Sequence, residues 1–310
     1  MSIRLVKPGA FTTIQDLGRP SWGSSGVPPS GAFDQLSLRA ANLLVGNDED
    51  AAGLEFTMNG PELLFDEPHE CALTGARFDA LLGAEPVETG RSFRVPAGAT
   101  LTIGGTRDGV RGYIAVSGGI DVDPVLGSRS TLVSAGFGGL DGRALVAGVV
   151  IPIGTGPERG PRVLRDGGLP SARAGLVLRA IPGPQEETFT DEAMARFYSE
   201  EYRVSPRADR AGVRLDGPPL ALTGDADIDP EGVVTGAVQV PADGLPIVLG
   251  PDRPATGGYA KIATVIAADV PLLAQARPGA TLRFARTTIE EARTAWRERS
   301  SRMRNAVEDA

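Results

Sequence analysis

The stretch Thr256-Gly257-Gly258-Tyr259, followed closely by Lys261, is the part of the sequence best suited to binding an anion. Two adjacent glycines allow backbone N–H groups to approach a ligand closely, and a lysine adds a compact positive charge. Such groups can stabilise negative charge that develops on an oxygen during a reaction. The same residues also fit a tight glycine turn beside a surface lysine. The pattern therefore predicts an anion pocket, with a purely structural turn as the alternative.

Other polar side chains could contribute to such a pocket or serve the fold instead. Asp34 begins an amphipathic segment, residues 34–47, so its carboxylate could accept a proton in a reaction or cap a helix. Asn42 and Gln239 carry amide groups that could bind an amide ligand, and each also has a structural explanation. Arg210 could contact a ligand or belong to a buried ion pair.

The chain contains one histidine, His69, and one cysteine, Cys71. A zinc site normally takes three or four ligands that are mostly His and Cys, so we expect no metal site in this chain. A Ser-His-Asp or Cys-His mechanism would have to use His69. We instead expect His69 in an exposed turn before a strand that buries Cys71. The sequence has no P-loop pattern. We therefore expect any chemistry to use acidic, basic, hydroxyl and amide side chains and backbone amides.

Glycine and proline are unusually frequent, at 41 and 25 of 310 residues, without a collagen-like period. With 41% hydrophobic residues, this composition favours many turns between short strands and predicts a mainly β fold. The net charge of −8 argues against binding to nucleic acid. No apolar run approaches the roughly 20 residues of a membrane span. The N-terminus lacks a signal-peptide pattern, so we expect a cytoplasmic protein.

The spacing of the elements predicts two β domains that would position these side chains. Strand-like segments separated by Gly and Pro recur through the first half without intervening helices, which is typical of antiparallel sandwiches or barrels. A stretch rich in Gly, Pro and Arg follows and is typical of a linker. We expect an N-terminal domain over residues 1–160, a linker over 161–175, and a C-terminal domain over 176–310 that ends in a helix.

Seven stretches form a distinctive succession that includes the residues above. They are FTTIQDLGR (11–19), GVPPSGAFD (26–34), YIAVSGGI (113–120), LGSRST (126–131), DRAGVRL (209–215), GAVQVP (236–241) and DRPATGGYAKI (252–262). This succession resembles the family of 5-oxoprolinase C-type subunits, also called allophanate hydrolase subunit 2 or KipA-like proteins. It also resembles the matching carboxyltransferase region of urea carboxylase. The resemblance covers roughly residues 5–285.

The resemblance implies two cyclophilin-like β-barrel domains with a few short helices. It implies a partner, a B-type (KipI-like) subunit of related fold, and in 5-oxoprolinase an A-type subunit as well. The reaction implied is the ATP-driven opening of a small cyclic amide, 5-oxoproline, to glutamate. The chain is expected to be inactive alone, and ATP is expected to bind the complex, not necessarily this chain.

Beside this resemblance, the residues singled out above have the following expected roles. Lys261 and Asp34 are the expected catalytic residues. The expected substrate-binding residues are Asn42, Gln239, Thr256, Gly257, Gly258, Tyr259 and Arg210. Two alternatives stay open. One is a biotin-dependent carboxyltransferase component of the urea carboxylase type, which would require a separate biotin carrier. The other is a KipA-like regulator that acts by binding a partner protein.

Overall fold

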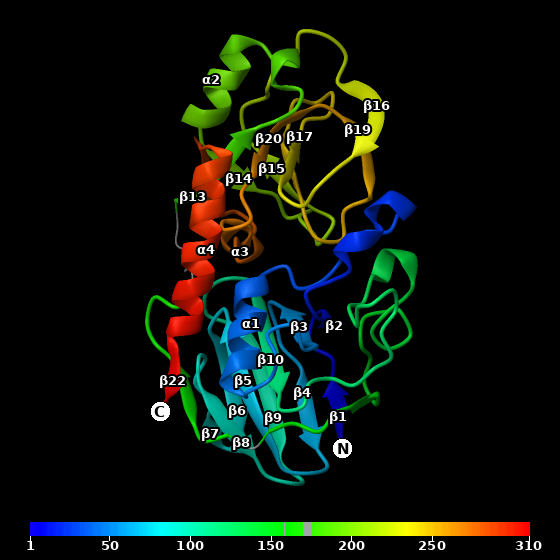
Figure 1. Cartoon of the computed structure of the whole chain (residues 1–310), viewed down its shortest axis with the longest axis vertical. Helices are drawn as coiled ribbons and strands as arrows, with labels where there is room; N and C mark the ends of the chain where they lie inside the picture. The colour runs from blue at the N-terminus through cyan, green and yellow to red at the C-terminus, as the bar shows by residue number, and fades with distance from the viewer. Residues whose placement is uncertain (158, 170–174) are drawn as a thin grey trace. The chain divides into compact units, whose positions relative to one another are not determined.

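The computed structural model of the chain describes residues 1–157, 159–169 and 175–310 (Figure 1). These residues form mainly β-strands with few α-helices, which confirms the fold class predicted from the sequence. The chain divides into two compact units. Among the described residues, unit 1 comprises 1–19, 30–157, 159–169 and 299–310, and unit 2 comprises 20–29 and 175–298.

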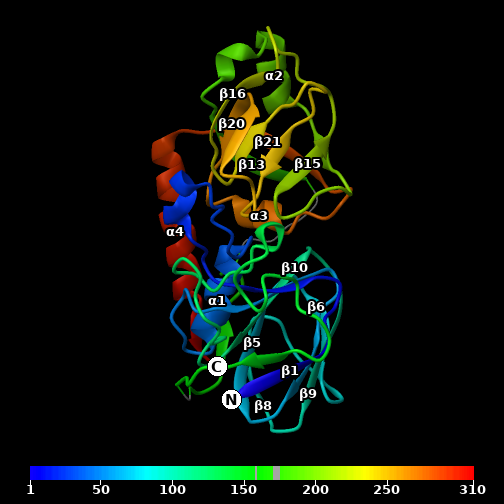
Figure 2. The same cartoon turned by 90° about the vertical axis from the view of Figure 1, so that its right-hand side faces the viewer.

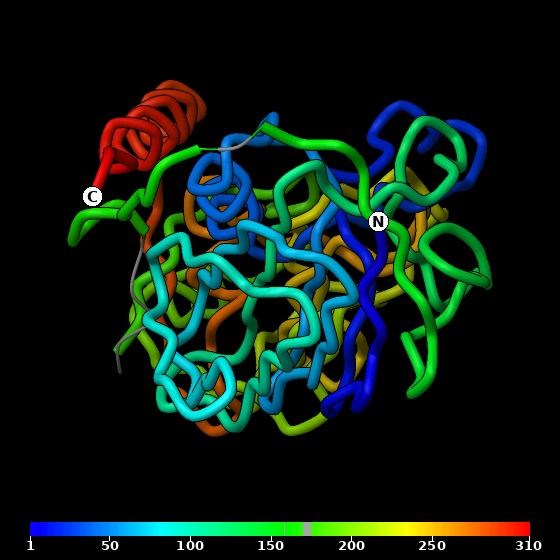
Figure 3. Tube along the Cα trace, turned by 90° about the horizontal axis from the view of Figure 1, so that it is seen from below, coloured from blue at the N-terminus to red at the C-terminus, as the bar shows by residue number. Residues whose placement is uncertain are grey.

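The division differs from the contiguous domains expected from the sequence, because the end of the chain groups with unit 1. Strand β22 (Val307–Asp309) pairs antiparallel with β12 (Arg162–Leu164). The C-terminal end of the trace, where β22 lies, can be followed in Figure 3. Strand β12 lies within the expected linker, 161–175, so the first part of that segment belongs to the fold. The expected linker residues 170–174 lie outside the described residues.

Unit 1 contains two antiparallel sheets that share one core. The first has the order β11 (Val150–Pro152), β1 (Ser2–Lys7), β4 (Glu62–Phe65), β9 (Thr100–Thr106), β6 (Phe78–Leu82) and β7 (Glu85–Pro86). The second has the order β2 (Thr12–Gln15), β3 (Gly53–Thr57), β10 (Arg111–Val116), β5 (His69–Gly75) and β8 (Ser92–Val95). Alternate residues from both sheets, among them Leu5, Phe56, Leu63 and Ile114, enter one buried cluster. Burial of this apolar surface stabilises the unit.

Helix α1 (Gln35–Leu44) packs on β10 and β5 of the second sheet in unit 1. Asp34 is its N-cap, as the sequence predicts, and accepts a hydrogen bond from the backbone N–H of Ser37. Leu36 and Leu44 of this helix are fully buried. The Thr74 hydroxyl of β5 donates to the Ser37 carbonyl at 2.7 Å, which fixes the first turn of the helix against the sheet.

Unit 2 is built around a closed barrel of seven strands (Figure 2). Their order is β13 (Leu176–Pro182), β20 (Lys261–Val265), β17 (Ala237–Gln239), β18 (Ile247–Leu249), β15 (Gly212–Asp216), β14 (Tyr202–Val204) and β21 (Thr281–Arg286). Only β13 and β21 pair in parallel among the neighbours described. Phe197 of helix α2 (Asp191–Ser199) stacks on Phe284 with ring centroids 4.3 Å apart, and this contact anchors the helix on β21.

A separate two-stranded ribbon accompanies the barrel of unit 2. It consists of β16 (Asp227–Gly232) and β19 (Thr256–Tyr259), which pair antiparallel with an irregular register between Asp227 and Glu231 (Figure 1). Strand β16 is largely exposed. We call this pair the β16–β19 ribbon, and it contains the glycine pair highlighted by the sequence.

Of the remaining helices, α4 (Ile289–Asn305) is long and the others are short. They are α3 (Val270–Ala274) and the 3-10 helices η1 (Pro20–Ser25), η2 (Val133–Ala135) and η3 (Glu186–Thr188). Helix α4 begins after the last barrel strand and leads directly into β22. None of the helices in the described part of the chain combines the length and apolar composition that crossing a bilayer requires.

Candidate functional site

The segment Thr256–Tyr259 forms strand β19 of the ribbon, so the alternative of a tight glycine turn is wrong. Gly257 and Gly258 have no positive φ, the conformation that an anion-binding turn of paired glycines would need. The reason is pairing: Gly257 lies opposite Glu231 in β16, and this ladder keeps the backbone extended. The anion-binding potential of this region therefore depends on side chains, above all on Lys261.

Lys261 is buried, with 3% of the residue exposed, so the alternative of a surface lysine is also wrong. It is the first residue of barrel strand β20 and lies directly opposite Gln239 of β17. Directly opposed residues in an antiparallel pair place their side chains on the same face of the sheet. The barrel therefore brings Lys261 and Gln239 together, as neighbours that are 22 positions apart in the sequence.

Two further side chains complete what we call the Lys261 cluster: Lys261, Gln239, Glu231 and Gln185. Lys261 Nζ lies 2.6 Å from Glu231 Oε1, and Gln185 Nε2 donates to the same oxygen at 2.8 Å. The backbone N–H of Lys261 donates to Gln185 Oε1 at 3.2 Å. The close contact with the Lys261 ammonium, followed by the hydrogen bond from Gln185, lowers the pKa of the Glu231 carboxyl. The cluster thus holds an ionised carboxylate against a buried ammonium.

Gly257 matters to this cluster for its lack of a side chain. A Cβ atom at Gly257 would collide with the side-chain amide of Gln239, whereas a Cβ at Gly258 would make only ordinary contacts. Gln239 Nε2 lies 3.5 Å from the Tyr259 carbonyl oxygen, at the outer limit of a hydrogen bond. Gly257 therefore allows the ribbon to pass close to the amide of Gln239.

The two glycines provide a matched pair of variants. Gly257→Ala is expected to displace Gln239 and to destabilise unit 2 by about 1–3 kcal/mol, the usual cost of overpacking. Gly258→Ala should change the free energy of unfolding by less than about 0.5 kcal/mol, because its new methyl group has room. Urea unfolding of both variants measures the difference. Equal effects of the two substitutions would contradict the steric role of Gly257.

The amino-acid composition holds one further signal for Lys261. Lys7 and Lys261 are the only lysines among 31 basic residues, so the chain uses arginine almost everywhere else. Lys7 also pairs with a glutamate at 2.6 Å, Glu62, but its side chain is 73% exposed, against 4% for Lys261. A lysine in a buried position differs chemically from arginine because it is a compact point charge with three donors, whereas the guanidinium is planar.

Asp34 and Asn42 lie in unit 1, at the start of helix α1 and within it, and each has structural contacts. Asp34 is 1% exposed, and its two carboxylate oxygens accept from the Ser37 amide at 3.0 Å and the Ser37 hydroxyl at 2.7 Å. Asn42 is fully buried, donates to the Ala51 carbonyl at 2.7 Å and accepts from Asn47 at 3.1 Å. These contacts match the structural explanation of both residues, and their roles in catalysis and binding stay predictions.

Arg210 lies in unit 2 and forms an ion pair with Asp252. Its Nε and Nη2 atoms donate to the two carboxylate oxygens at 2.7 and 2.9 Å, the bidentate geometry of a strong pair. Both side chains are about nine-tenths buried. The buried ion pair expected as one alternative for Arg210 is therefore present, and contact of Arg210 with a ligand stays a prediction.

A second buried acid, Glu55, which no sequence motif indicated, lies next to Asp34. Glu55 is 1% exposed, and its Oε2 accepts from the Tyr113 hydroxyl and the Phe33 amide, both at 2.8 Å. Arg111 Nε lies 3.7 Å from Glu55 Oε1. Burial first, and then the charges of Glu55 and Asp34, raise the pKa of Tyr113 well above its usual value. The available signal was a glutamate inside the apolar strand Gly53–Thr57.

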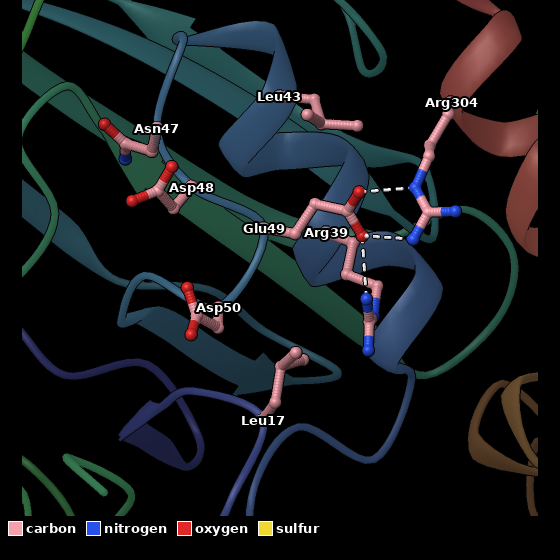
Figure 4. A pocket seen from close by; sticks show the side chains of 8 residues that line it. All are labelled: Leu17, Arg39, Leu43, Asn47, Asp48, Glu49, Asp50 and Arg304. Atoms are coloured by element: carbon pink, nitrogen blue, oxygen red, sulfur yellow. Dashed lines mark hydrogen bonds and ion pairs between the residues drawn. The ribbon is translucent and has the colours of Figure 1, made fainter.

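An open depression of about 480 Å³ lies at the C-terminal side of α1 in unit 1 (Figure 4). Glu49 is its centre, because the carboxylate accepts from Arg304 Nε at 2.5 Å and from Arg39 Nη1 at 2.7 Å. Figure 4 shows both guanidinium groups meeting this carboxylate, with Asp48 and Asp50 on its other side. The guanidinium groups of Arg304 and Arg39 are already paired with Glu49. We therefore interpret this depression as a structural contact, in which Glu49 holds the end of α4 through Arg304.

The pKa of Glu49 is lowered, chiefly by the hydrogen bond from Arg304 and also by that from Arg39, against the opposing effect of burial. A lowered folded-state pKa contributes stability above the ordinary value, 4.5, and loses it as the pH falls through the folded-state value. Glu49→Gln is therefore expected to cost about 1 kcal/mol at pH 7. Urea unfolding at several pH values should show this difference shrinking below pH 4.5. A difference that stays constant with pH would contradict the ion pair as its cause, and Glu88→Gln, in an exposed pair, is the control.

His69 is buried rather than exposed, which corrects the expectation of an exposed turn residue. It is the first residue of β5, and its ring lies 5.9 Å from that of Phe65, so the strand begins earlier than the sequence indicated. Burial lowers the pKa of His69. Cys71 is buried as expected, and burial raises the pKa of its thiol well above the usual value. Within the described ranges, no three His, Cys, Asp or Glu side chains are grouped so as to hold a metal ion.

Cys71 is expected to resist alkylation in the folded protein. The thiolate is the reactive form, and a raised pKa together with full burial keeps its population and its accessibility low. Iodoacetamide at pH 8, followed by mass spectrometry of the intact chain, should show no modification until urea unfolds the protein. Rapid modification of the native chain would contradict this.

Comparisons with known proteins agree on one family. Residues 25–286 match the family described as "Carboxyltransferase domain, subdomain A and B". The chain is 40% identical to the C-type subunit of 5-oxoprolinase from Escherichia coli (strain K12) over 290 residues, 94% of this chain and 93% of that protein. It is 35% identical to the C-type subunit of 5-oxoprolinase from Haemophilus influenzae, over 90% of this chain and 89% of that protein.

Longer proteins contain a similar region. Urea amidolyase of Saccharomyces cerevisiae is 31% identical over 94% of this chain but only 17% of its own length. The crystal structure of K. lactis urea amidolyase superimposes on this fold with a TM-score of 0.94 at 29% identity. That match covers 100% of this chain and 20% of the larger chain. The chain therefore spans about a fifth of these longer proteins.

Proposed function

We propose that this chain, which belongs to the carboxyltransferase-domain family, is the C-type subunit of a heteromeric, ATP-dependent hydrolase that opens 5-oxoproline to glutamate. The observation that carries the proposal is its nearly complete mutual coverage with the corresponding 5-oxoprolinase subunit of E. coli. Two chains of the same extent and this identity are expected to perform the same task. A protein that is one part of a complex acts with other chains, so we propose a B-type and an A-type partner and expect no activity from this chain alone.

The Lys261 cluster supports the chemistry of this proposal. A lactam carbonyl is stabilised by resonance, so attack by water requires stabilisation of the negative charge that develops on oxygen. A buried ammonium interacts with such charge more strongly than one in water, because the surrounding dielectric constant is low. We propose that one N–H of the Lys261 ammonium supplies this charge to the lactam oxygen, which leaves its other two donors for a further anionic group, and that Gln239 contacts the amide of the substrate. ATP is assigned to the assembled complex as a co-substrate.

A second candidate function follows from the fold match with urea amidolyase along the whole chain. A carboxyltransferase component of that type would require biotin on a separate carrier. The identity favours the first proposal, because the chain is 40% identical to the E. coli 5-oxoprolinase subunit but 33% and 31% identical to the urea amidolyases. The distinction is experimental and depends on which substrate the assembled complex consumes.

The test is reconstitution. The chain is co-expressed with its B-type and A-type partners, the complex is isolated by size exclusion, and glutamate release from 5-oxoproline is measured with and without ATP. We expect ATP-dependent glutamate release by the complex and none by any single component. An assembled complex that releases no glutamate would overturn the proposal. Transfer of the carboxyl group from a carrier already loaded with carboxybiotin to urea would then establish the second candidate.

A further inference from the structure

The ammonium of Lys261 has fewer partners than its donors require. A lysine ammonium carries three N–H donors. Nζ is fully buried, lies 2.6 Å from Glu231 Oε1, and makes no well-oriented hydrogen bond to any group in the described part of the chain. A buried ammonium with unfilled donors is costly unless further oxygen atoms reach it. The position is therefore suited to receiving oxygen atoms from a ligand.

Glu231, the partner of this ammonium, is much more exposed to solvent than Lys261. Its side chain is 44% exposed, and it belongs to the β16–β19 ribbon, outside the ladder of the barrel that holds Lys261. If the pair separates, water can solvate the glutamate, but the buried lysine needs another anion in its place. The pair is thus asymmetric: one partner is fixed in the barrel wall and the other can leave.

We propose that Glu231 is an internal, displaceable ligand of Lys261, which occupies the position that the carboxylate of a small-molecule ligand takes on binding. The ribbon then acts as a cover over the site. Its register is irregular between Asp227 and Glu231, so the ladder is interrupted on the side of Glu231 that faces Asp227, while Glu231 itself stays paired with Gly257. Binding of the ligand exchanges one carboxylate for another and moves Glu231 into water.

The surroundings indicate the class of ligand. Gly257, opposite Glu231 in the ribbon, has no side chain, and the amide of Gln239 lies beside it. A ligand that places a carboxylate on Lys261 would thus meet an amide group that both donates and accepts hydrogen bonds. This combination fits a small carboxylate that also carries an amide. The choice of 5-oxoproline as the main probe rests on the proposed function, whereas the exchange of Glu231 does not.

The exchange of Glu231 for a ligand carboxylate is tested by amine labelling of the full chain and of the reconstituted complex. The chain has two lysines, Lys7 and Lys261, and the labelling rate of each is measured separately. The reagent is N-succinimidyl acetate, and mass spectrometry gives the acetylation rates of Lys261 and of the exposed Lys7. Lys261 should react at least about 10-fold more slowly than Lys7. The probes are 5-oxoproline, acetate, and 2-pyrrolidinone, which has the same ring without the carboxylate. The first two should slow the labelling of Lys261, and the third should not.

The decisive variant is Glu231→Gln, which removes the competing charge. We expect it to speed the labelling of Lys261 and to lower the concentration of 5-oxoproline that protects Lys261 by about tenfold, because the binding position is no longer occupied. Glu231→Asp, which shortens the side chain, should act in the same direction if the Gln variant is poorly folded. Glu62→Gln is the matched control, because it alters the equal-length pair of Lys7 and should leave Lys261 unaffected.

The outcomes separate this inference from the proposed function. Stronger protection by acetate in Glu231→Gln, with none by 5-oxoproline, would support the exchange and remove 5-oxoproline as the substrate. A protecting concentration that is unchanged or higher in Glu231→Gln, for both anions, would overturn the exchange. Protection by 2-pyrrolidinone equal to that by 5-oxoproline would also overturn it, because a carboxylate would then not be what Lys261 binds.

Discussion

Replacing Lys261 by Met is expected to lower the turnover of 5-oxoproline by the reconstituted complex by about 10²–10³-fold, the usual effect of removing one group that stabilises an oxyanion. The substitution removes the charge but keeps an unbranched side chain of similar length in the barrel wall. Glu231 loses the ammonium but keeps the hydrogen bond from Gln185, and it is exposed enough to be solvated. The fold should therefore stay intact, with a melting temperature equal to or above that of the parent chain, since a buried charge is gone.

Two controls sharpen the result for Lys261. Lys7→Met, at the exposed lysine, should leave turnover unchanged and alter stability by less than about 0.5 kcal/mol. Lys261→Arg keeps the charge but adds volume in a position that is 3% exposed, so activity should recover only in part. Unchanged turnover in Lys261→Met, with the complex assembled, would move the catalytic centre elsewhere, with the B-type partner as the next candidate.

Local features of the fold were predictable because their signals are close together in the sequence. Asp34 is followed three residues later by Ser37, and a capped helix needs little more than that spacing. The backbone conformation of the glycine pair was not predictable in this way, because Gly257 gains its extended backbone from pairing with Glu231, 26 positions away. Glycine alone allows either conformation. Tertiary pairing, which no local pattern encodes, therefore decided the structure of the segment.

The candidate site shows the same limit more clearly. The sequence pointed to Lys261, but it gave no sign that the side chain is buried or that Glu231 and Gln185 contact it. Gln185 is 76 positions away, and the two meet only because barrel closure brings the end of β13 next to β20. The family resemblance gave the correct region, whereas the charge balance of the site depends on contacts that arise only in the folded barrel.

Glu55→Ala is expected to destabilise unit 1 by about 3–5 kcal/mol, the usual cost of breaking a buried ion pair by removing one partner. The Phe33 amide and the Tyr113 hydroxyl share Oε2 of this carboxylate as an acceptor, and Arg111 lies beside its other oxygen. Without Glu55, these donors stay buried next to a cavity. The free energy of unfolding in urea at pH 7, followed by hydrogen exchange of amides in β3 and β10, measures the loss.

Matched variants separate the effect of charge from that of hydrogen bonding at Glu55. Glu55→Gln keeps a carbonyl oxygen that can accept from the Tyr113 hydroxyl or the Phe33 amide, so it should cost less, about 1–3 kcal/mol. Glu62→Ala removes the glutamate of an ion pair whose lysine is exposed, and it should cost no more than about 1 kcal/mol. If Glu55→Ala costs no more than Glu62→Ala, the buried network does not hold α1 on its sheet. A free energy of unfolding that rises from Glu55→Ala to Glu55→Gln to the parent chain would instead establish Glu55 as the group that fixes the start of the helix capped by Asp34.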